Sequence, residues 1–394
     1  MAVARRIQEA IERSSWIRKM FEEGARLKAV HGADNVFDFS LGNPDVDPPA
    51  AFRHTLTRVA AEERPGVHGY MPNAGFEETR SAVAAQVGQE QGVSLESRHV
   101  VMTCGAAGGL NCIFKALLDP GDEVVVPAPY FVEYGFYAEN HGGRLSVVPT
   151  RDDFTLDLGA IEAAINQNTK AVLLNSPNNP TGQVYDASSL NRLGELLEQQ
   201  SGKLGKTLFL ISDEPYRKLV YDGDTVPSVF KAYRNTIITS SYSKDISLPG
   251  ERIGYLAVHP EADQVTLLMD ALVLANRVLG FVNAPAFMQR VVRDLQGSCV
   301  DVNLYQTRRD LFCRGLTEAG YEMITPRGAF YLFPRSPIAD DVEFVRMLQE
   351  ENILVVPGSG FGKPGHFRIS YCVSEKTISR SLPGFARARS RALS

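Results

Sequence analysis

The chain has 394 residues, of which 44% are hydrophobic and 22% are charged. This composition is typical of a globular protein and excludes disorder, collagen and coiled coil as the main architecture. The length predicts two domains, or one large α/β domain with an appendage. The formal net charge is −5, from 41 Lys and Arg residues against 46 Asp and Glu residues. Nucleic-acid binding usually brings a positive surplus, so we expect no nucleic-acid partner.

The cysteines, the histidines and the hydropathy of the chain indicate which kinds of site and which location to expect. Five cysteines, far apart along the chain, predict neither a disulfide framework nor a zinc site. The seven histidines show no metal-ligand spacing, so we expect no bound metal. The most apolar long stretch, residues 267–287, is interrupted by Asp270, Asn276 and Arg277, which argues against a membrane span. The N-terminus has no apolar run behind its arginines, and we expect a cytoplasmic protein.

Helical patterns dominate the N-terminal part of the chain. The first pattern places its apolar side chains on one helical face: Trp16, Ile17, Met20, Phe21 and Leu27. Ser14 or Ser15 is the expected N-cap of this helix. Residues 37–49 predict a short strand and then a loop rich in Gly, Pro and Asp. Two further helices are expected, one after Pro49 and one over residues 75–91.

From residue 98 onward, short apolar runs alternate with helical stretches. Seven such runs lie at residues 99–103, 123–127, 145–149, 170–175, 208–213, 236–240 and 252–258. They are rich in Val, Ile and Leu and do not alternate with polar residues, as expected for strands buried on both faces. Because most are separated by helix-length segments, they predict a mostly parallel sheet with helices on both sides.

The pattern also predicts a division into domains. After about residue 260, long helical patterns are joined by shorter strands at residues 328–333, 353–357 and 367–370. This change marks a smaller α+β domain. We expect residues 48–289 to form the large domain, residues 290–394 to form the small domain, and residues 1–47 to pack with the small domain.

Four motifs follow the ends of predicted strands, where ligands bind in open α/β sheets. They are TCGAAGG at residues 103–109, NSPNNPTG at 175–182, LFLISDEPY at 208–216 and SYSKDISLPGERIGY at 241–255. The small residues of the first would let backbone N–H groups approach a phosphate, although an ordinary helix-entry turn fits equally well. The second is either a Pro/Asn turn or the source of an asparagine amide that donates to a ligand oxygen.

The third and fourth motifs carry charged residues. Asp213 ends an apolar strand, so it is either a structural cap or the partner of a buried cation, and Tyr216 follows it closely. A lone lysine is usually a solvated surface charge, but Lys244 follows a strand and two serines and precedes Arg252. A lysine in a site can form a Schiff base, and Arg with Ser suits a phosphate dianion.

Pyridoxal 5′-phosphate needs this combination: an amine anchor, a phosphate cradle, a partner for the pyridine nitrogen and a donor to the ring oxygen. The chain resembles the class I/II aminotransferases of the fold-type-I pyridoxal phosphate family. The resemblance rests on NNPTG, DEPY, SYSK and ERIGY in this order, and it extends from FSLGNPDVDPP through HGYMPNAGFEETRSAVA to FRISY. It implies an α/β fold, with a seven-stranded, mostly parallel sheet in the large domain and a smaller α+β domain.

The family pattern also implies roles for the cofactor-binding residues. Lys244 is implied to form the internal Schiff base and to carry the proton between the substrate Cα and the cofactor. Asp213 is implied to keep the pyridine nitrogen protonated, while Tyr216 and Asn179 hydrogen-bond the ring oxygen. The phosphate is implied to bind a set drawn from three segments: Gly105, Ala106, Ala107, Ser241, Ser243 and Arg252.

Four other residues take roles from the same resemblance. Tyr130, in PAPYF, resembles the aromatic side chain that stacks on the cofactor ring. Tyr70, in HGYMPNAG, resembles the tyrosine that reaches the phosphate from the partner subunit, which implies a homodimer with shared sites. Arg368, in HFRIS, resembles the arginine that binds the substrate α-carboxylate, with Gly42 supplying a backbone contact beside it. The alternatives are a core aromatic for Tyr130, a helix-entry aromatic for Tyr70 and a structural salt bridge for Arg368.

A second carboxylate site depends on Arg277. Aspartate-type relatives bind the side-chain carboxylate of dicarboxylic substrates with an arginine from the partner subunit, a few residues before Asn-Pro-Pro. The corresponding stretch here reads NRVLGFVNAP, with Arg277 about one residue out of register. Arg277 either binds a substrate side chain or simply extends to solvent or pairs with a nearby acid.

The implied activity is a ping-pong transfer of an amino group from an L-amino acid to a 2-oxo acid. A β-elimination lyase on the same scaffold is the alternative within the enzymes. A ligand-sensing regulator built on an aminotransferase-like domain is disfavoured, because the stretch before FDFSLGNP is short and not strongly basic.

Overall fold

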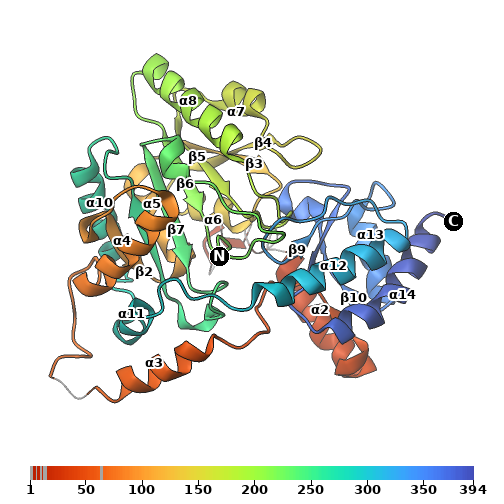
Figure 1. The fold of residues 1–394 in the computed structure, drawn as a ribbon. Helices are drawn as coiled ribbons and strands as arrows, with labels where there is room; N and C mark the ends of the chain where they lie inside the picture. The colour runs from red at the N-terminus through yellow and green to blue at the C-terminus, as the bar shows by residue number, and fades with distance from the viewer. Residues whose placement is uncertain (1–2, 6, 9–10, 12–15, 63–64) are drawn as a thin grey trace.

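The computed structural model describes residues 3–5, 7–8, 11, 16–62 and 65–394. The largest sheet has seven strands in the order β2-β8-β7-β6-β5-β3-β4. Figure 1 shows this sheet with helices around it. The strands are β2 (Val100–Thr103), β3 (Glu123–Ala128), β4 (Arg144–Pro149), β5 (Thr169–Asn175), β6 (Phe209–Asp213), β7 (Thr236–Ser241) and β8 (Gly254–Val258). Only β8 runs antiparallel to its neighbours among these strands. All seven predicted strands and the mostly parallel sheet are therefore confirmed.

Both faces of this sheet are buried, because adjacent strand residues belong to different hydrophobic clusters. In β6, for example, Leu210 packs in one cluster and Ile211 in the other. One face is covered by α5 (Gly105–Leu117), α6 (Glu133–Glu139) and α10 (Val265–Val278). The other is covered by α3 (Ala50–Ala60), α4 (Glu77–Gln91), α7 (Leu158–Ala164), α8 (Ala187–Leu204), α9 (Val229–Ala232) and α11 (Ala286–Arg293).

Two small sheets lie in the rest of the chain. In the first, β1 (Phe37–Asp38) pairs in parallel with β10 (Ile353–Leu354). In the second, β12 (Phe367–Ser370) pairs with β11 (Val356–Pro357) and β9 (Tyr331–Leu332). Around them pack α2 (Trp16–His31), α12 (Val302–Glu318), α13 (Asp341–Glu350) and α14 (Glu375–Ala392), and short 3-10 turns occur at Ala33–Asn35, Ser97–His99, Pro249–Glu251 and Gly358–Phe361.

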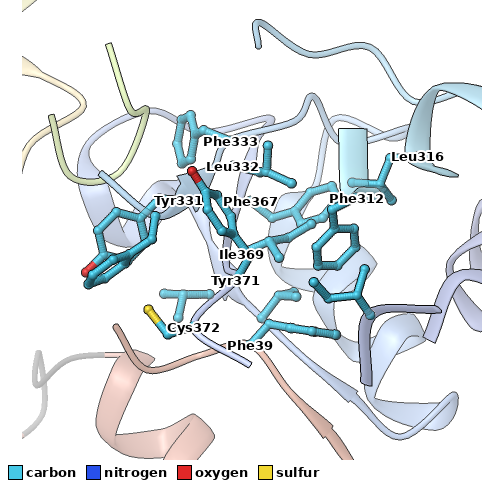
Figure 2. Close-up of a cluster of buried hydrophobic side chains, with 14 of the residues drawn as sticks. Phe39, Phe312, Leu316, Tyr331, Leu332, Phe333, Phe367, Ile369, Tyr371 and Cys372 are labelled. Carbon is cyan, nitrogen blue, oxygen red and sulfur yellow. The ribbon is translucent and has the colours of Figure 1, made fainter. Parts of the chain in front are cut away.

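A third hydrophobic cluster joins the N-terminal segment to the C-terminal elements. Phe39 packs there against Phe312 of α12 at a ring-centroid distance of 5.1 Å, and Phe367 and Ile369 of β12 belong to the same cluster (Figure 2). The helix α2 contacts the strands β10 and β11, although these segments are far apart in sequence, and Figure 1 shows α2 near β10. Ser14 and Ser15, the expected N-cap residues of α2, lie outside the described residues.

The predicted boundary after residue 289 falls inside α11. This helix packs against α3 and α4 and shares the hydrophobic cluster of the large sheet. We therefore propose that the large domain includes the whole of α11 and that the small domain begins after it.

The contact between α8 and α9 gives a test of the packing over the large sheet. A Cβ atom at buried Gly194 would overlap the backbone carbonyl of Ala232, whereas a Cβ at exposed Gly202, also in α8, would meet open space. Gly194→Ala should lower the free energy of unfolding by about 1–3 kcal/mol, because a backbone carbonyl cannot rotate away. Gly202→Ala should raise it by about 0.5–1 kcal/mol through helix propensity alone. Urea denaturation of both variants checks the difference, and equal changes would contradict the packing.

Candidate active site

A cavity lies at the carboxyl ends of the central parallel strands, as the topology of open α/β sheets predicts. It is enclosed by the ends of β5, β6 and β7, the first turn of α5, the segment at residues 41–42, and the strands β9 and β12. Most of the predicted site residues line it: Gly42, Ala106, Ala107, Asn179, Asp213, Tyr216, Ser241, Ser243, Lys244, Arg252 and Arg368.

Lys244 is the only lysine among the described residues that line this cavity. Its Nζ donates a hydrogen bond to the backbone carbonyl of Gly42, with an N···O distance of 2.7 Å. Burial lowers the pKa of Lys244 to about 8, and the positive charges of Arg368 and Arg252 act in the same direction. About a tenth of this amine is therefore neutral, and nucleophilic, at pH 7, far more than for an ordinary lysine.

Asp213 is a buried carboxylate in which one of the two oxygens has no hydrogen-bond partner among the described atoms. Oδ2 accepts a 2.6 Å hydrogen bond from the hydroxyl of Tyr134, while Oδ1 has no partner among the described atoms. Burial raises the pKa of Asp213 to about 7, and the bond from Tyr134 only partly opposes this effect. A cationic group in the cavity would compensate the buried charge. Of the two alternatives for Asp213, the geometry therefore favours the partner of a buried cation over a structural cap.

The first turn of α5 and Arg252 together form an anion-binding corner. No side chain caps this helix, so its first N–H groups are free to bind a ligand. Gly105 has φ 72°, a backbone conformation that favours glycine, and an ideal Cβ at this position would lie 3.1 Å from Nη2 of Arg252, so a larger residue would push the guanidinium slightly away from the helix end. Arg252 forms no ion pair with any described residue, which leaves its charge available for an anion.

Arg368 is a buried cation without a carboxylate partner in the described part of the chain. Its side chain is 2% exposed, and its guanidinium lies between the rings of Tyr331 and Phe361, 4.8 Å from each centroid. It donates to Asn179 Oδ1 at 3.0 Å and to the backbone carbonyl of Ser40 at 2.6 Å, while Nε has no partner. These neutral contacts leave the charge uncompensated, so the predicted structural salt bridge is not found and an anionic ligand fits here.

The predicted role of Tyr130 is not supported by the placement of its side chain, which does not line the cavity. Tyr130 packs beside Gly362, and its backbone N–H bonds to the carbonyl of Phe361. The next residue, Phe131, lines the cavity instead. The motif PAPYF holds two adjacent aromatic residues, and its spacing alone does not show which of them faces the ligand.

Tyr70 and Arg277 also lie away from the cavity of their own chain. The side chain of Tyr70 is 94% exposed. Arg277 is exposed in the last turn of α10 and makes no hydrogen bond or ion pair with the described residues. Both positions are compatible with contact to a second subunit, which the resemblance implies for Tyr70 and which is one of the two alternatives for Arg277; exposure of Arg277 fits the solvent alternative equally well.

Three tyrosines that line the cavity were missing from the sequence prediction: Tyr134, Tyr137 and Tyr331. Tyr134, in α6, holds Asp213, and no motif marks it because helical spacing does not show which carboxylate lies opposite. Tyr331 lies in β9, within the predicted strand GAFYLF, and its hydroxyl is 2.9 Å from that of Tyr216. Pairing β9 correctly with β12 would have placed Tyr331 near Arg368, but one sequence does not reveal that register.

A family model described as aminotransferase class I and II matches residues 34–382. The chain belongs to this family. It is similar to the aspartate/prephenate aminotransferase of Thermus thermophilus, with 34% identity over 365 residues, covering 90% of this chain and 91% of that protein. Among solved structures it resembles an aminotransferase from Eubacterium rectale, with 40% identity, a TM-score of 0.97 and full coverage of both chains. The aspartate aminotransferase of Thermus thermophilus with maleate has 30% identity and a TM-score of 0.88, covering 98% of this chain and 100% of that one.

Membership of the class I and II aminotransferases makes the chain an enzyme of the transferase class and supports the predicted fold. Two other features of the described residues bear on function. None of their helices is long and apolar enough to cross a membrane. They also contain no group of three or more His, Cys, Asp or Glu side chains arranged to hold a metal ion.

The low pKa of Lys244 gives a pH test of the site. Since only the neutral amine reacts, acetylation of Lys244 by acetic anhydride should follow a titration with its midpoint near pH 8 in the cofactor-free protein. Mass spectrometry of digests labelled across a pH series measures the rate, and the exposed Lys115 in the same digests is the reference. If the two lysines show the same midpoint, the environment assigned to Lys244 is wrong.

Proposed function

We propose that the protein is a pyridoxal-phosphate-dependent aminotransferase that moves an amino group from an L-amino acid to a 2-oxo acid by a ping-pong mechanism. One observation carries this proposal. A single cavity holds an amine of lowered pKa, a buried carboxylate without a cation, a buried guanidinium without an anion, and an anion-binding helix end. Pyridoxal phosphate and an amino acid together present the complementary groups.

The residues present fit this cofactor. Lys244 is the amine that would attach it, and Oδ1 of Asp213 is the free acceptor for a protonated pyridine nitrogen. Its phosphate would bind at the first turn of α5, with Arg252, Ser241 and Ser243 around it. Tyr216 and Asn179 lie where they can hydrogen-bond the ring oxygen, and Phe131, in place of Tyr130, would pack on the ring.

The bound cofactor supplies an aldehyde that captures amines and a ring that accepts the electron pair released from the substrate Cα. Lys244 supplies the base and acid for the proton at Cα, since a pKa of about 8 suits both steps near neutral pH. Asp213 holds a proton on the pyridine nitrogen by charge, and Tyr134 fixes the orientation of its carboxylate. Arg368 binds the substrate α-carboxylate and thereby orients Cα relative to Lys244.

A second copy of the chain is the expected partner. Leu267, Leu274 and Val278 are exposed on α10 and recur at helical spacing, so they form one apolar stripe. A large exposed apolar surface usually marks an interface. Tyr70, at 94% exposure, is likewise free to reach outward. These features support a homodimer in which Tyr70 reaches the phosphate site of the partner subunit.

The proposed reaction is tested by following both amino acid and ammonia. With an amino donor and a 2-oxo acid, the purified protein should form the new amino acid in equal amount to the 2-oxo product. Without the acceptor it should stop after the first half-reaction, because the amino group taken from the donor then has no acceptor. A β-elimination lyase would instead release ammonia continuously without any acceptor. Borohydride treatment should fix the cofactor on Lys244, and Lys244→Ala should abolish turnover, because the same amine moves the proton. Lys115→Ala, which removes an exposed lysine, is the matched control.

Dicarboxylic substrates give a separate prediction about Arg277. Of the relatives named above, the two from Thermus thermophilus are an aspartate/prephenate aminotransferase and an aspartate aminotransferase, and the latter was solved with maleate, a dicarboxylate. If Arg277 reaches the partner's cavity, Arg277→Leu should weaken transition-state binding of aspartate and glutamate by about 2–4 kcal/mol. The value of kcat/KM for these donors would then fall by about 30- to 900-fold, while alanine and phenylalanine would be almost unaffected.

The comparison needs kcat/KM for all four donors in the wild type, Arg277→Leu and Arg192→Leu, the last removing an exposed arginine of α8. Equal losses for all donors in Arg277→Leu would show that Arg277 has only a structural role.

A further inference from the structure

Tyr331 occupies a central place in the cavity that none of the roles above explains. Strand pairing puts it opposite Ser370, and Arg368 lies two residues before Ser370 on the same strand, so Tyr331 and Arg368 share one face of the small sheet. The guanidinium of Arg368 lies 4.8 Å from the ring centroid of Tyr331. One side of the tyrosine therefore supports the proposed carboxylate site.

The hydroxyl of Tyr331 points to the proposed cofactor side of the cavity. It lies 2.9 Å from the hydroxyl of Tyr216, and both phenols are buried. Gly42 makes this placement possible, because any Cβ atom there would overlap the Tyr331 hydroxyl. The backbone of Gly42 also accepts the hydrogen bond of Lys244, so the same glycine fits both side chains.

A phenol has one proton to donate, so a pair of hydrogen-bonded phenols has a direction. If Tyr216 donated to Tyr331, it would have no proton left for the ring oxygen of the cofactor. If Tyr331 donates to Tyr216, the proton of Tyr216 is free to point into the cavity. Only the second arrangement is compatible with the role proposed for Tyr216.

We propose that Tyr331 is a positioning residue: its hydroxyl donates to Tyr216 and so directs the Tyr216 proton toward the cofactor, while its ring holds Arg368 for the substrate carboxylate. This inference rests on the proposed function. Tyr331 acts on the cofactor through Tyr216, and on the substrate carboxylate through Arg368.

The charges around the pair favour this direction. Arg368 faces Tyr331 from β12, and its positive charge makes the Tyr331 phenol a better donor. Burial and the neighbouring Tyr331 raise the pKa of Tyr216, Arg368 lowers it, and the negative charge of Asp213, from β6, raises it further. Cys372 also faces Tyr331, and Lys244 Nζ lies 6.0 Å from the Tyr216 ring centroid. Burial raises the pKa of Tyr331 to about 12, so the phenol keeps its proton across the working pH range.

The hydroxyl role is tested by the pH midpoint of the absorption band of the lysine-bound cofactor in the holoenzyme. A donor to the ring oxygen stabilises its ionised form, so weakening that donor should raise the midpoint. Tyr331→Phe should raise it by about half a unit to one unit. Tyr216→Phe should raise it by at least as much. Because Tyr331 acts through Tyr216, the double variant should match Tyr216→Phe alone.

The ring role is tested separately with succinate, which binds as a carboxylate but has no amino group to react. Calorimetric titration of the holoenzyme should give a Kd for Tyr331→Phe within about twofold of the wild type, because the ring over Arg368 is kept. Tyr331→Leu, which removes the ring, should weaken succinate binding about tenfold or more. Equal affinities in the wild type and Tyr331→Leu would overturn the ring role.

Tyr305→Phe is the matched control. Tyr305 is buried, its ring contacts Phe330 at 5.4 Å, and its hydroxyl has no partner among the described atoms. This variant should leave both the midpoint and the Kd unchanged. The hydroxyl role is overturned if Tyr331→Phe leaves the midpoint unchanged, or if it shifts the midpoint equally with and without Tyr216. If the wild type forms no cofactor adduct on Lys244, the proposed function itself fails. If the adduct forms but Tyr331→Phe leaves the midpoint unchanged, only the role of the Tyr331 hydroxyl fails.

Discussion

Two buried charges of opposite sign, Asp213 and Arg368, share one cavity without pairing with each other. Each retains an atom with no hydrogen-bond partner among the described residues. A direct ion pair would satisfy both charges, but β6 and β12 belong to different sheets and hold them apart. Because isolated buried charges are costly, a ligand that brings a cation to Asp213 and an anion to Arg368 would stabilise the fold. Other residues of the site hold these two groups, and the polar groups between them, in position.

Close backbone approaches provide much of that support. Gly105 lets Arg252 reach the end of α5, and a Cβ at Gly254 would lie 2.8 Å from the Cα of Gly105, so the two glycines let β8 and α5 meet. Gly42 serves Lys244 and Tyr331 in the same way on the opposite side of the cavity. The chain thus places small residues where three or more polar groups must converge within a few ångströms.

The sequence was sufficient to predict the parts of the molecule that depend on local pattern. The seven buried strands were recognisable by their unbroken apolar runs, and the motifs ending them placed Asp213, Asn179 and Lys244 at one edge. Tyr130 was predicted to face the ligand, but Phe131 lines the cavity. The sequence does not show in which direction each of two adjacent aromatic side chains points. Tyr134 and Tyr331 were missed because their roles depend on which helix or strand lies opposite. Roles for Tyr70 and Arg277 depend on a second chain, which no local pattern describes.

The pairing of β1 with β10 joins residue 37 to residue 353 and brings the segment at Ser40 and Gly42 next to Arg368. Within one chain, the cavity-lining groups proposed to hold the cofactor lie between residues 105 and 252, whereas the carboxylate site needs this long-range pairing. In a growing or refolding chain, contacts between such distant residues form late, because closing a long loop costs entropy. The residues of the cofactor half of the cavity are therefore synthesised before those of the substrate half. The carboxylate site can form only after the C-terminal strands β10 and β12 have been made.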